Sequence, residues 1–168
     1  MTLEESCNLA VTNSPRTYQR MKNALHLKLP RTTIAQRLLG NRARVVAALR
    51  ALWAAHEETP AEVEIIFVDE PTIQKLHDDY LHDASSTDII TFDLGVSPEG
   101  ARLGALYICP EVAKRFAARY KVTLGQELHR LIAHGILHLL GYDDHSPQDK
   151  RRMRREENKI LARINRAA

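Results

Sequence analysis

Two histidines four residues apart carry the clearest chemical signal in this sequence. His134 and His138 lie in a segment rich in leucine and isoleucine, and on a helix residues four apart project from one face at neighbouring heights. Neutral imidazole nitrogens bind zinc at about 2.0–2.1 Å, and a hydrolytic zinc site keeps three protein ligands and one position for water. The pair therefore predicts two ligands of a metal site that needs a third.

Asp144 and His145 are the candidates for the third ligand. Both follow Gly141, which fits a left-handed helix C-cap and lets the chain turn back towards the two histidines. Carboxylate oxygen and imidazole nitrogen both bind zinc. If both residues coordinated, four protein ligands would close the site to water, and the metal would be structural rather than catalytic. The residue types leave both possibilities open.

Core packing is the alternative interpretation of the two histidines. The apolar residues around the pair are Leu131, Ile132, Ala133, Ile136, Leu137, Leu139 and Leu140. A single histidine in such a segment is usually a hydrogen-bonded core residue. Two at ligand spacing, followed by a glycine turn and further potential ligands, are harder to explain in this way, because each buried imidazole needs a partner. Metal binding is therefore the favoured interpretation.

The helix that would carry these ligands has clear boundaries. Thr123 and Gln126 fit a capping box, in which two side chains satisfy free amide groups at the helix start, and the helix is expected to end near Leu140. Elsewhere the periodicity of apolar residues predicts alternating helices and strands. The expected strands cover residues 24–29, 63–68, 88–92 and 105–109, and the expected helices cover 32–56, with a possible break at 40–41, 71–80, 110–120 and a last one from 146. This order suggests an α+β fold.

Length and composition favour one intracellular domain. A chain of 168 residues fits a single domain, which we place at residues 23–168. Residues 1–22 lack periodicity and are expected to form an N-terminal extension. Cys7 and Cys109 have no paired spacing, which is typical of a reducing compartment. The first thirty residues contain no apolar segment of the kind that signals secretion or membrane insertion, so we expect a cytoplasmic protein without a membrane partner.

The net charge of +3 is unevenly distributed along the chain. Residues 1–60 hold nine Lys and Arg against four Asp and Glu, and residues 147–168 hold eight against three. Residues 61–146 hold seven against fourteen, so two basic ends flank an acidic centre. Basic surfaces attract polyanions by neutralising phosphates and releasing counterions, which makes nucleic acid a reasonable partner. Solvated helix faces explain the same charges equally well.

Three segments resemble one known family. Residues 134–143, HGILHLLGYD, closely resemble the signature of the YbeY family, the metal-dependent endoribonucleases of bacterial ribosomal RNA maturation. Tyr80 together with residues 86–92, STDIITF, is similar to the family's threonine–aspartate strand, and residues 104–110 are similar to the strand that follows. The resemblance covers about residues 60–160 and leaves out the N-terminal extension.

The resemblance implies both a fold and a function. The fold is α+β, a small mixed sheet of about four strands flanked by helices, with a zincin-like metal site on a central helix. The function is a zinc-dependent, single-strand-specific endoribonuclease that holds one Zn²⁺ and acts in ribosomal RNA processing, at the 3′ end of 16S rRNA, and in ribosome quality control. The implied partners are single-stranded ribosomal RNA and the ribosome or its small-subunit proteins.

Several basic side chains are candidates for guiding RNA to such a site. They are Arg130, Lys150, Arg151 and Arg154. Positively charged grooves follow the backbone of single strands. Surface solubility is the competing role for most of these residues.

This chain departs from the family pattern at two positions. The family usually places a third histidine ten residues after the first ligand, where this chain has Asp144, with His145 following. The spacing favours Asp144, because His145 would need a one-residue bulge to reach the metal. The family also commonly has an arginine directly after the tyrosine at position 80, and this chain has Leu81. Any phosphate-clamping role of that arginine must come from elsewhere, or the activity is expected to be weaker.

The residue after the first histidine distinguishes a metallopeptidase from other metal-dependent hydrolases. In HExxH metallopeptidases it is the glutamate that acts as general base, and here it is Gly135, so peptidase chemistry is disfavoured. RNA can supply its own 2′-hydroxyl as the nucleophile, so the missing glutamate is less damaging to a ribonuclease. The alternative function is a ribosome-assembly factor that binds RNA without cutting it and holds a structural metal.

Overall fold

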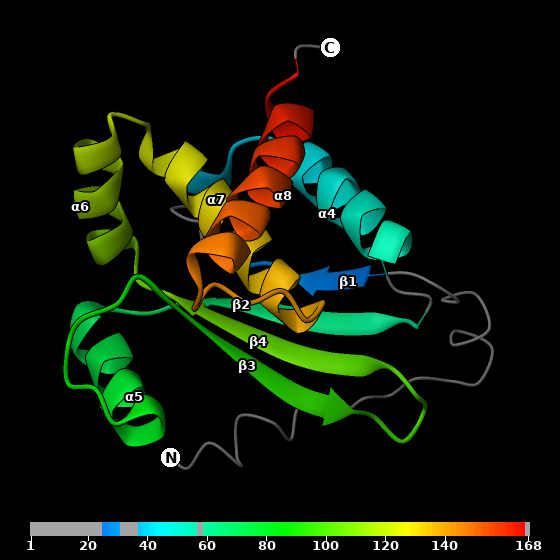
Figure 1. The fold of residues 1–168 in the computed structure, drawn as a ribbon, viewed down its shortest axis with the longest axis horizontal. Coiled ribbons are helices and arrows are strands. Elements are labelled where there is room, and N and C mark those ends of the chain that lie inside the picture. The colour runs from blue at the N-terminus through cyan, green and yellow to red at the C-terminus, as the bar shows by residue number, and fades with distance from the viewer. Residues whose placement is uncertain (1–24, 31–36, 57–58, 167–168) are drawn as a thin grey trace.

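A computed structural model describes the chain over residues 25–30, 37–56 and 59–166. The expected extension at residues 1–22 lies outside this part, as does the start of the helix expected from residue 32. Helices and strands alternate along the described residues, as Figure 1 shows. Their bounds are β1 Leu25–Lys28, α4 Arg42–His56, β2 Ala61–Phe67, α5 Glu70–Leu81, β3 Ile89–Val96, β4 Arg102–Ile108, α6 Pro110–Tyr120, α7 Leu124–Leu139 and α8 Pro147–Asn165.

The strands form one mixed sheet in the order β1-β2-β4-β3. Strands β1, β2 and β4 run parallel to one another, and β3 runs antiparallel to β4 at one edge. The parallel pair β1 and β2 needs a crossover connection, and α4 provides it. The expected small mixed sheet of about four strands flanked by helices is therefore confirmed for the described residues.

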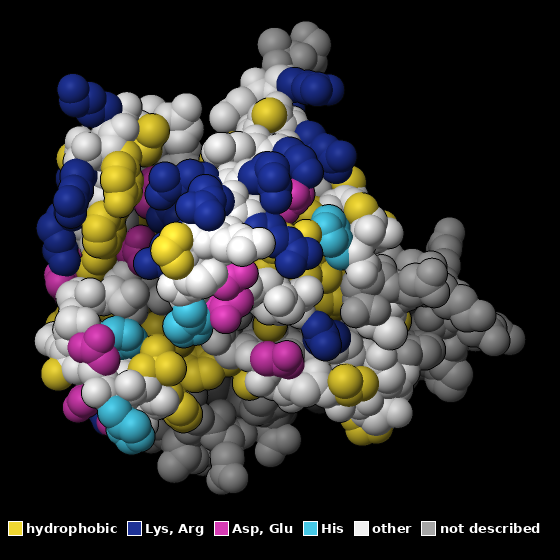
Figure 2. All heavy atoms as spheres, in the orientation of Figure 1, with side chains coloured by type: hydrophobic (Ala, Val, Ile, Leu, Met, Phe, Trp, Pro, Cys, Tyr) yellow, Lys and Arg dark blue, Asp and Glu magenta, His cyan; other side chains and the backbone are white. Residues whose placement is uncertain are grey.

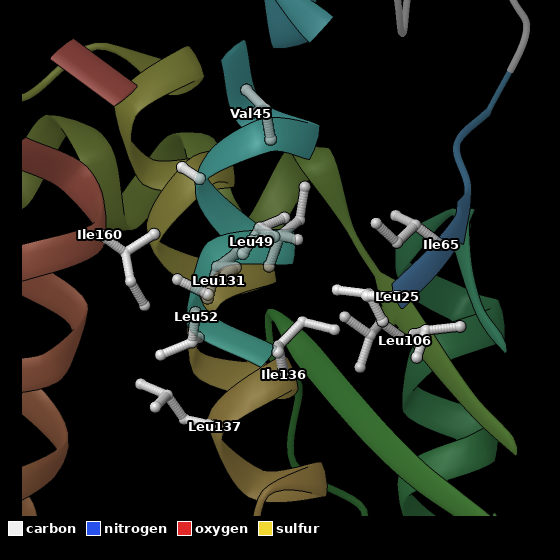
Figure 3. Packing of buried hydrophobic residues seen from close by; sticks show 14 of the residues in the cluster. Leu25, Val45, Leu49, Leu52, Ile65, Leu106, Leu131, Ile136, Leu137 and Ile160 are labelled. Atoms are coloured by element: carbon white, nitrogen blue, oxygen red, sulfur yellow. The ribbon is translucent and has the colours of Figure 1, made fainter. Parts of the chain in front are cut away.

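Helix α7 packs against the sheet and against α4, α6 and α8. Figure 1 shows α4, α7 and α8 on one face of the sheet, with α5 on the opposite side. The side chains of α7 pack into the main apolar core, part of which Figure 3 shows. Its fully buried members include Leu128, Leu131, Ile132, Ile136 and Leu137 of α7, which lie with Leu49 and Trp53 of α4 and Leu106 of β4. Because α7 is held on several sides, it is a rigid support for the two histidines that it carries.

Both ends of α7 are built as the sequence predicts. Thr123 and Gln126 form the reciprocal hydrogen bonds of a capping box at its start. At its end, the amide groups of Gly141 and Tyr142 donate to the carbonyl oxygens of His138 and Leu137, at 2.9 and 3.0 Å. Gly141 has a φ of 83°, the left-handed conformation that glycine adopts without strain. The chain therefore reverses immediately after His138.

Gly135 lets α7 lie close against the sheet. A Cβ atom at this position would stand 2.5 Å from Cδ2 of Leu106 and 2.9 Å from Oγ1 of Thr91. Leu106 is fully buried on β4 and has little room to move. The close approach of helix and sheet therefore depends on the absence of a side chain at residue 135.

Replacing Gly135 by alanine is expected to lower the free energy of unfolding by about 1–2 kcal/mol. Overpacking a core costs about 1–3 kcal/mol, and the better helix propensity of alanine returns up to about 1 kcal/mol. Urea unfolding of the two proteins measures the difference. In a Leu106→Ala background the same change should cost less, because the new methyl group enters space that the leucine has left. An equal cost in both backgrounds would contradict this account.

Two strands extend three or more residues beyond their expected bounds, and β2 begins two residues early, at Ala61. The strand expected at residues 88–92 continues to Val96, with an irregularity in its pairing between Asp93 and Val96. Strand β4 begins at Arg102, three residues earlier than expected, because it pairs with β2 from Ala61 onwards. Both extensions come from pairing with a neighbouring strand. Among the described residues, no helix combines the length and the apolar character that crossing a bilayer requires.

Candidate metal centre

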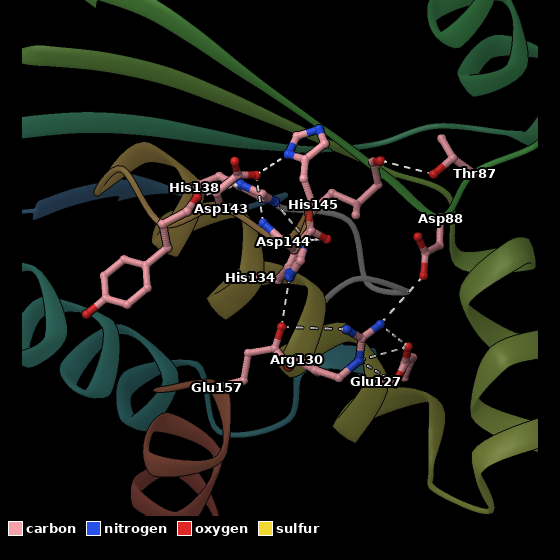
Figure 4. A network of polar contacts seen from close by, with 12 residues as sticks. Thr87, Asp88, Glu127, Arg130, His134, His138, Asp143, Asp144, His145 and Glu157 are labelled. Carbon is pink, nitrogen blue, oxygen red and sulfur yellow. Dashed lines mark hydrogen bonds and ion pairs between the residues drawn. The ribbon is translucent and has the colours of Figure 1, made fainter. Parts of the chain in front are cut away.

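The two predicted histidine ligands meet at the C-terminal end of α7. The Nε2 atoms of His134 and His138 lie 3.0 Å apart, with the rings edge to face. Asp144, from the loop that follows Gly141, places Oδ2 3.9 Å from Nε2 of His134. One potential ligand atom from each of the three residues lies within 4.8 Å of the others. Figure 4 shows the three side chains converging from the helix and the loop.

The other ring nitrogen of each histidine faces a hydrogen-bond acceptor. Nδ1 of His134 lies 2.7 Å from Oε1 of Glu157, and Nδ1 of His138 lies 3.0 Å from the carbonyl oxygen of Tyr142. An ionised carboxylate and a carbonyl only accept hydrogen bonds, so both Nδ1 atoms carry the hydrogen. In the neutral rings, both Nε2 atoms then present lone pairs to each other across 3.0 Å.

This arrangement fits a divalent cation. Two lone pairs at that separation repel unless a positive charge lies against both of them. Burial lowers the pKa of His138, and a proton on His134 would lower it further, which favours the neutral His138 ring that a metal requires. The contact from Glu157 to His134 is the carboxylate–histidine pair that commonly orients a zinc ligand. The donor set could therefore hold a metal ion through three protein ligands.

The two candidates for the third ligand lie in different surroundings. Asp144 lies with the two histidines, whereas the side chain of His145 is 88% exposed. His145 is hydrogen-bonded to Asp143 through Nδ1, and this bond raises the pKa of His145. His145 therefore groups with Asp143 and Asp144 and not with the histidines of α7. The structure brings three of the four predicted residues together and leaves His145 beside them.

Tyr142 anchors the loop that carries Asp144. Its hydroxyl lies 2.9 Å from Nε2 of His56, the last residue of α4. The guanidinium of Arg152, on α8, lies 4.7 Å from the centre of its ring, a cation–π geometry. The same residue offers its carbonyl oxygen to His138. Contacts from α4 and α8 thus hold Tyr142, which in turn orients His138. No local sequence signal predicts the contact from His56.

Arg130 lies beneath the histidines and holds three carboxylates. It donates to both oxygens of Glu127, at 2.6–3.1 Å, and lies 3.8 Å from Glu157 and 3.7 Å from Asp88. Glu127 and Glu157 are 2% and 5% exposed. Burial opposes the charge of Arg130, but the carboxylates outweigh it and raise its pKa. The expectation that Arg130 guides RNA is therefore replaced by a role in organising the carboxylates under the site (Figure 4).

The sequence analysis missed Glu157, although the sequence carries a signal for it. Met153, Ile160 and Ile164 are buried on one face of α8, and Glu157 occupies the same face. A charged residue on the apolar face of an amphipathic helix needs a partner. His134 and Arg130 are those partners.

Asp88, which immediately precedes β3, lies at the other side of the site. Burial raises the pKa of Asp88, although the charge of Arg130 partly opposes the rise. Thr87, beside it, donates its hydroxyl to the backbone of Ile89. Leu81, which replaces the arginine common in the family, is 58% exposed at the end of α5. Leu81 therefore offers no polar group to a phosphate.

Comparison with known sequences identifies one family. The family model described as Endoribonuclease YbeY matches residues 31–165. A protein named Endoribonuclease YbeY from Corynebacterium kroppenstedtii is 42% identical over 113 residues, which cover 61% of this chain and 56% of that protein. The proteins of that name from Chlamydia caviae and Bacteroides fragilis are 36% and 39% identical, over 67% and 68% of this chain and 73% and 81% of their own lengths. The match thus spans little more than half of the Corynebacterium protein.

A solved structure shows the same fold. The solution structure of TM1509 from Thermotoga maritima superposes with a TM-score of 0.56 and covers 83% of this chain and 88% of that one. The two sequences are 23% identical over this region. At this identity the likeness concerns the fold alone.

Proposed function

The chain belongs to the YbeY family, and from this premise we propose that it is a zinc-dependent endoribonuclease that cuts single-stranded RNA. Its relatives carry the name of that activity. The observation that carries the proposal is the pair of Nε2 atoms that face each other at 3.0 Å beside Asp144. Two ring nitrogens that face each other in this way favour a bound cation over core packing.

The proposed ligands of one zinc ion are His134, His138 and Asp144. Glu157 and the carbonyl of Tyr142 hold the two imidazoles in the required tautomer. When bound, zinc would polarise a phosphoryl oxygen or activate a water or hydroxyl nucleophile. The exposure of His145 favours three protein ligands over four, and hence a catalytic over a structural metal.

Gly135 supports an RNA substrate over a peptide. It occupies the position of the general-base glutamate in HExxH peptidases. A side chain there would collide with Leu106 and Thr91. The site therefore lacks the peptidase base and has no room for it.

The biological role that we propose is ribosomal RNA processing, at the 3′ end of 16S rRNA, and ribosome quality control in the cytoplasm. Its partners would be single-stranded ribosomal RNA and the ribosome or its small-subunit proteins. The resemblance of residues 134–143 to the family signature supports this role. A labelled fragment that spans the 3′ end of precursor 16S rRNA is accordingly the substrate to test first.

The test compares cleavage of that fragment by wild type and by His138→Ala, each with zinc and with a chelator. Wild type with zinc should cut the single-stranded fragment and spare the same sequence in a duplex, and the other samples should not cut. Asp144→Ala should lose cleavage, whereas the matched variant His145→Ala should retain it. If wild type and His138→Ala behave alike while the protein binds zinc and RNA, the assembly-factor function replaces the catalytic one.

A further inference from the structure

Helix α8 carries three exposed cations beside the metal centre. Lys150, Arg151 and Arg154 form what we call the α8 basic face, and all three side chains are exposed. Residues three and four apart on a helix are neighbours, so the three charges lie on one side of α8. Like charges at this spacing repel each other. A bound polyanion would relieve that repulsion.

The acidic residues of α8 are all engaged elsewhere. At the helix start, the carboxylate of Asp149 accepts a hydrogen bond from the Ser146 hydroxyl, and the backbone amide of Asp149 donates to the oxygen of that hydroxyl. Glu156 pairs with Lys159 and Arg155, and Glu157 turns inward to His134.

Within the part of the chain that the structure describes, no ion pair involves Lys150, Arg151 or Arg154. Arg152 differs from them, because its guanidinium stacks on Tyr142. The positive charge of the α8 basic face is therefore not neutralised by the protein.

The α8 basic face lies close to the ligand His134. Arg154 precedes Glu157 by three residues, about 4–5 Å along the helix axis, and Glu157 lies 2.7 Å from Nδ1 of His134. Figure 2 shows Lys and Arg side chains gathered over α8, with histidine and acidic side chains beside them. A strand bound along this part of α8 would pass next to the metal centre.

The position of the apolar face of α8 favours a nucleic acid over an anionic lipid surface as the bound polyanion. A helix that binds a lipid surface needs an exposed apolar face to insert between the headgroups. In α8 that face, with Met153, Ile160 and Ile164, is buried in the core. A nucleic acid needs only the charges and the donors of the arginine side chains.

From these observations we infer that the α8 basic face is the docking surface for the single-stranded RNA that the metal centre cuts. The inference rests on the proposed function, and it assigns the strand a path along the first turns of α8. It also predicts that charges in the first turns of α8 contribute to RNA binding and that charges at its far end do not. Arg163, near the far end of α8, lies about 14 Å from Arg154 along the axis, beyond the Debye length of about 8–10 Å at physiological salt.

The experiment measures RNA binding apart from cleavage, with an unstructured labelled RNA oligonucleotide and protein that carries His138→Ala. In this background Arg151→Gln/Arg154→Gln is compared with Arg163→Gln/Arg166→Gln, which removes the same charge from exposed arginines at the far end. Glutamine preserves the helix propensity. The first pair should weaken binding about tenfold at low salt. It should also reduce the slope of log affinity against log salt concentration by roughly 1.4, the change expected when two phosphate contacts of a single strand are lost. The far pair should change neither value appreciably.

Unchanged binding by the first pair, or an equal loss from the far pair, would overturn the inference. So would binding to anionic phospholipid vesicles that is as tight as binding to RNA and is lost in the same variant. Cleavage by the protein with His138 intact distinguishes the two proposals. If that protein cuts RNA and the first pair binds normally, only the docking surface is wrong. If it never cuts and the first pair still loses binding, the docking surface stands and the nuclease function falls.

Discussion

Replacing Arg130 by methionine is expected to lower the free energy of unfolding by about 3–5 kcal/mol, the usual cost of breaking a buried ion pair from one side. Methionine keeps the apolar contacts of the arginine stem and removes only the guanidinium. Glu127 and Glu157, almost fully buried, would then lose the charge that offsets them. Chemical denaturation of the metal-free protein measures the loss without interference from metal binding.

Two further variants show whether the unpaired carboxylates cause that loss. Replacing both partners of a buried pair by apolar residues is often neutral or stabilising. Arg130→Met/Glu127→Met should therefore be more stable than Arg130→Met alone, because Glu127 is the closest partner of Arg130. The stability of Arg130→Lys should fall between those of wild type and Arg130→Met, since lysine keeps the charge but cannot make the bidentate contact with a carboxylate. A double variant less stable than Arg130→Met would show that packing, and not charge, decides the effect.

Replacing Glu157 by glutamine is expected to weaken zinc binding by about 10- to 100-fold, the usual effect of losing the partner of a histidine ligand. Glutamine can still accept the hydrogen bond from Nδ1 of His134, but it lacks the negative charge that makes the ligand a stronger donor to the metal. Competition with a chromophoric chelator measures the affinity. Circular dichroism of the metal-free protein shows whether the variant is folded.

Glu156→Gln is the matched control for this prediction. It removes the same charge one residue away, from a side chain that is 13% exposed and pairs with Lys159 and Arg155 instead of a histidine. Its zinc affinity should stay within about threefold of wild type, because the two cations beside Glu156 offset its charge and it does not contact a proposed ligand. Equal losses in the two variants would mean that Glu157 acts only through the net charge of α8. An unchanged affinity of Glu157→Gln would remove Glu157 from the metal centre.

Both predictions concern one connected group of side chains. Glu157 contacts His134 on one side and Arg130 on the other. Arg130 also reaches Glu127 and Asp88, the residue before β3. The packing of α7 against α8 and the orientation of His134 therefore depend on the same few charges.

The sequence by itself determined the local parts of this molecule. The capping box at Thr123, the turn at Gly141 and the shared face of His134 and His138 depend on residues within four positions of each other. Such features follow from helix geometry alone. The family signature depends on the same residues, which is why the fold class and the candidate metal site were both predictable.

Only the tertiary structure decided which distant residues meet. Glu157 is 23 positions from His134, and His56 is 86 positions from Tyr142. The choice between Asp144 and His145 also depends on the path of a loop anchored by such contacts. Strand β3 extends to Val96 because β4 offers it hydrogen-bond partners across the sheet. In each case the stabilising partner lies far along the chain, so periodicity and local propensity contain no information about it.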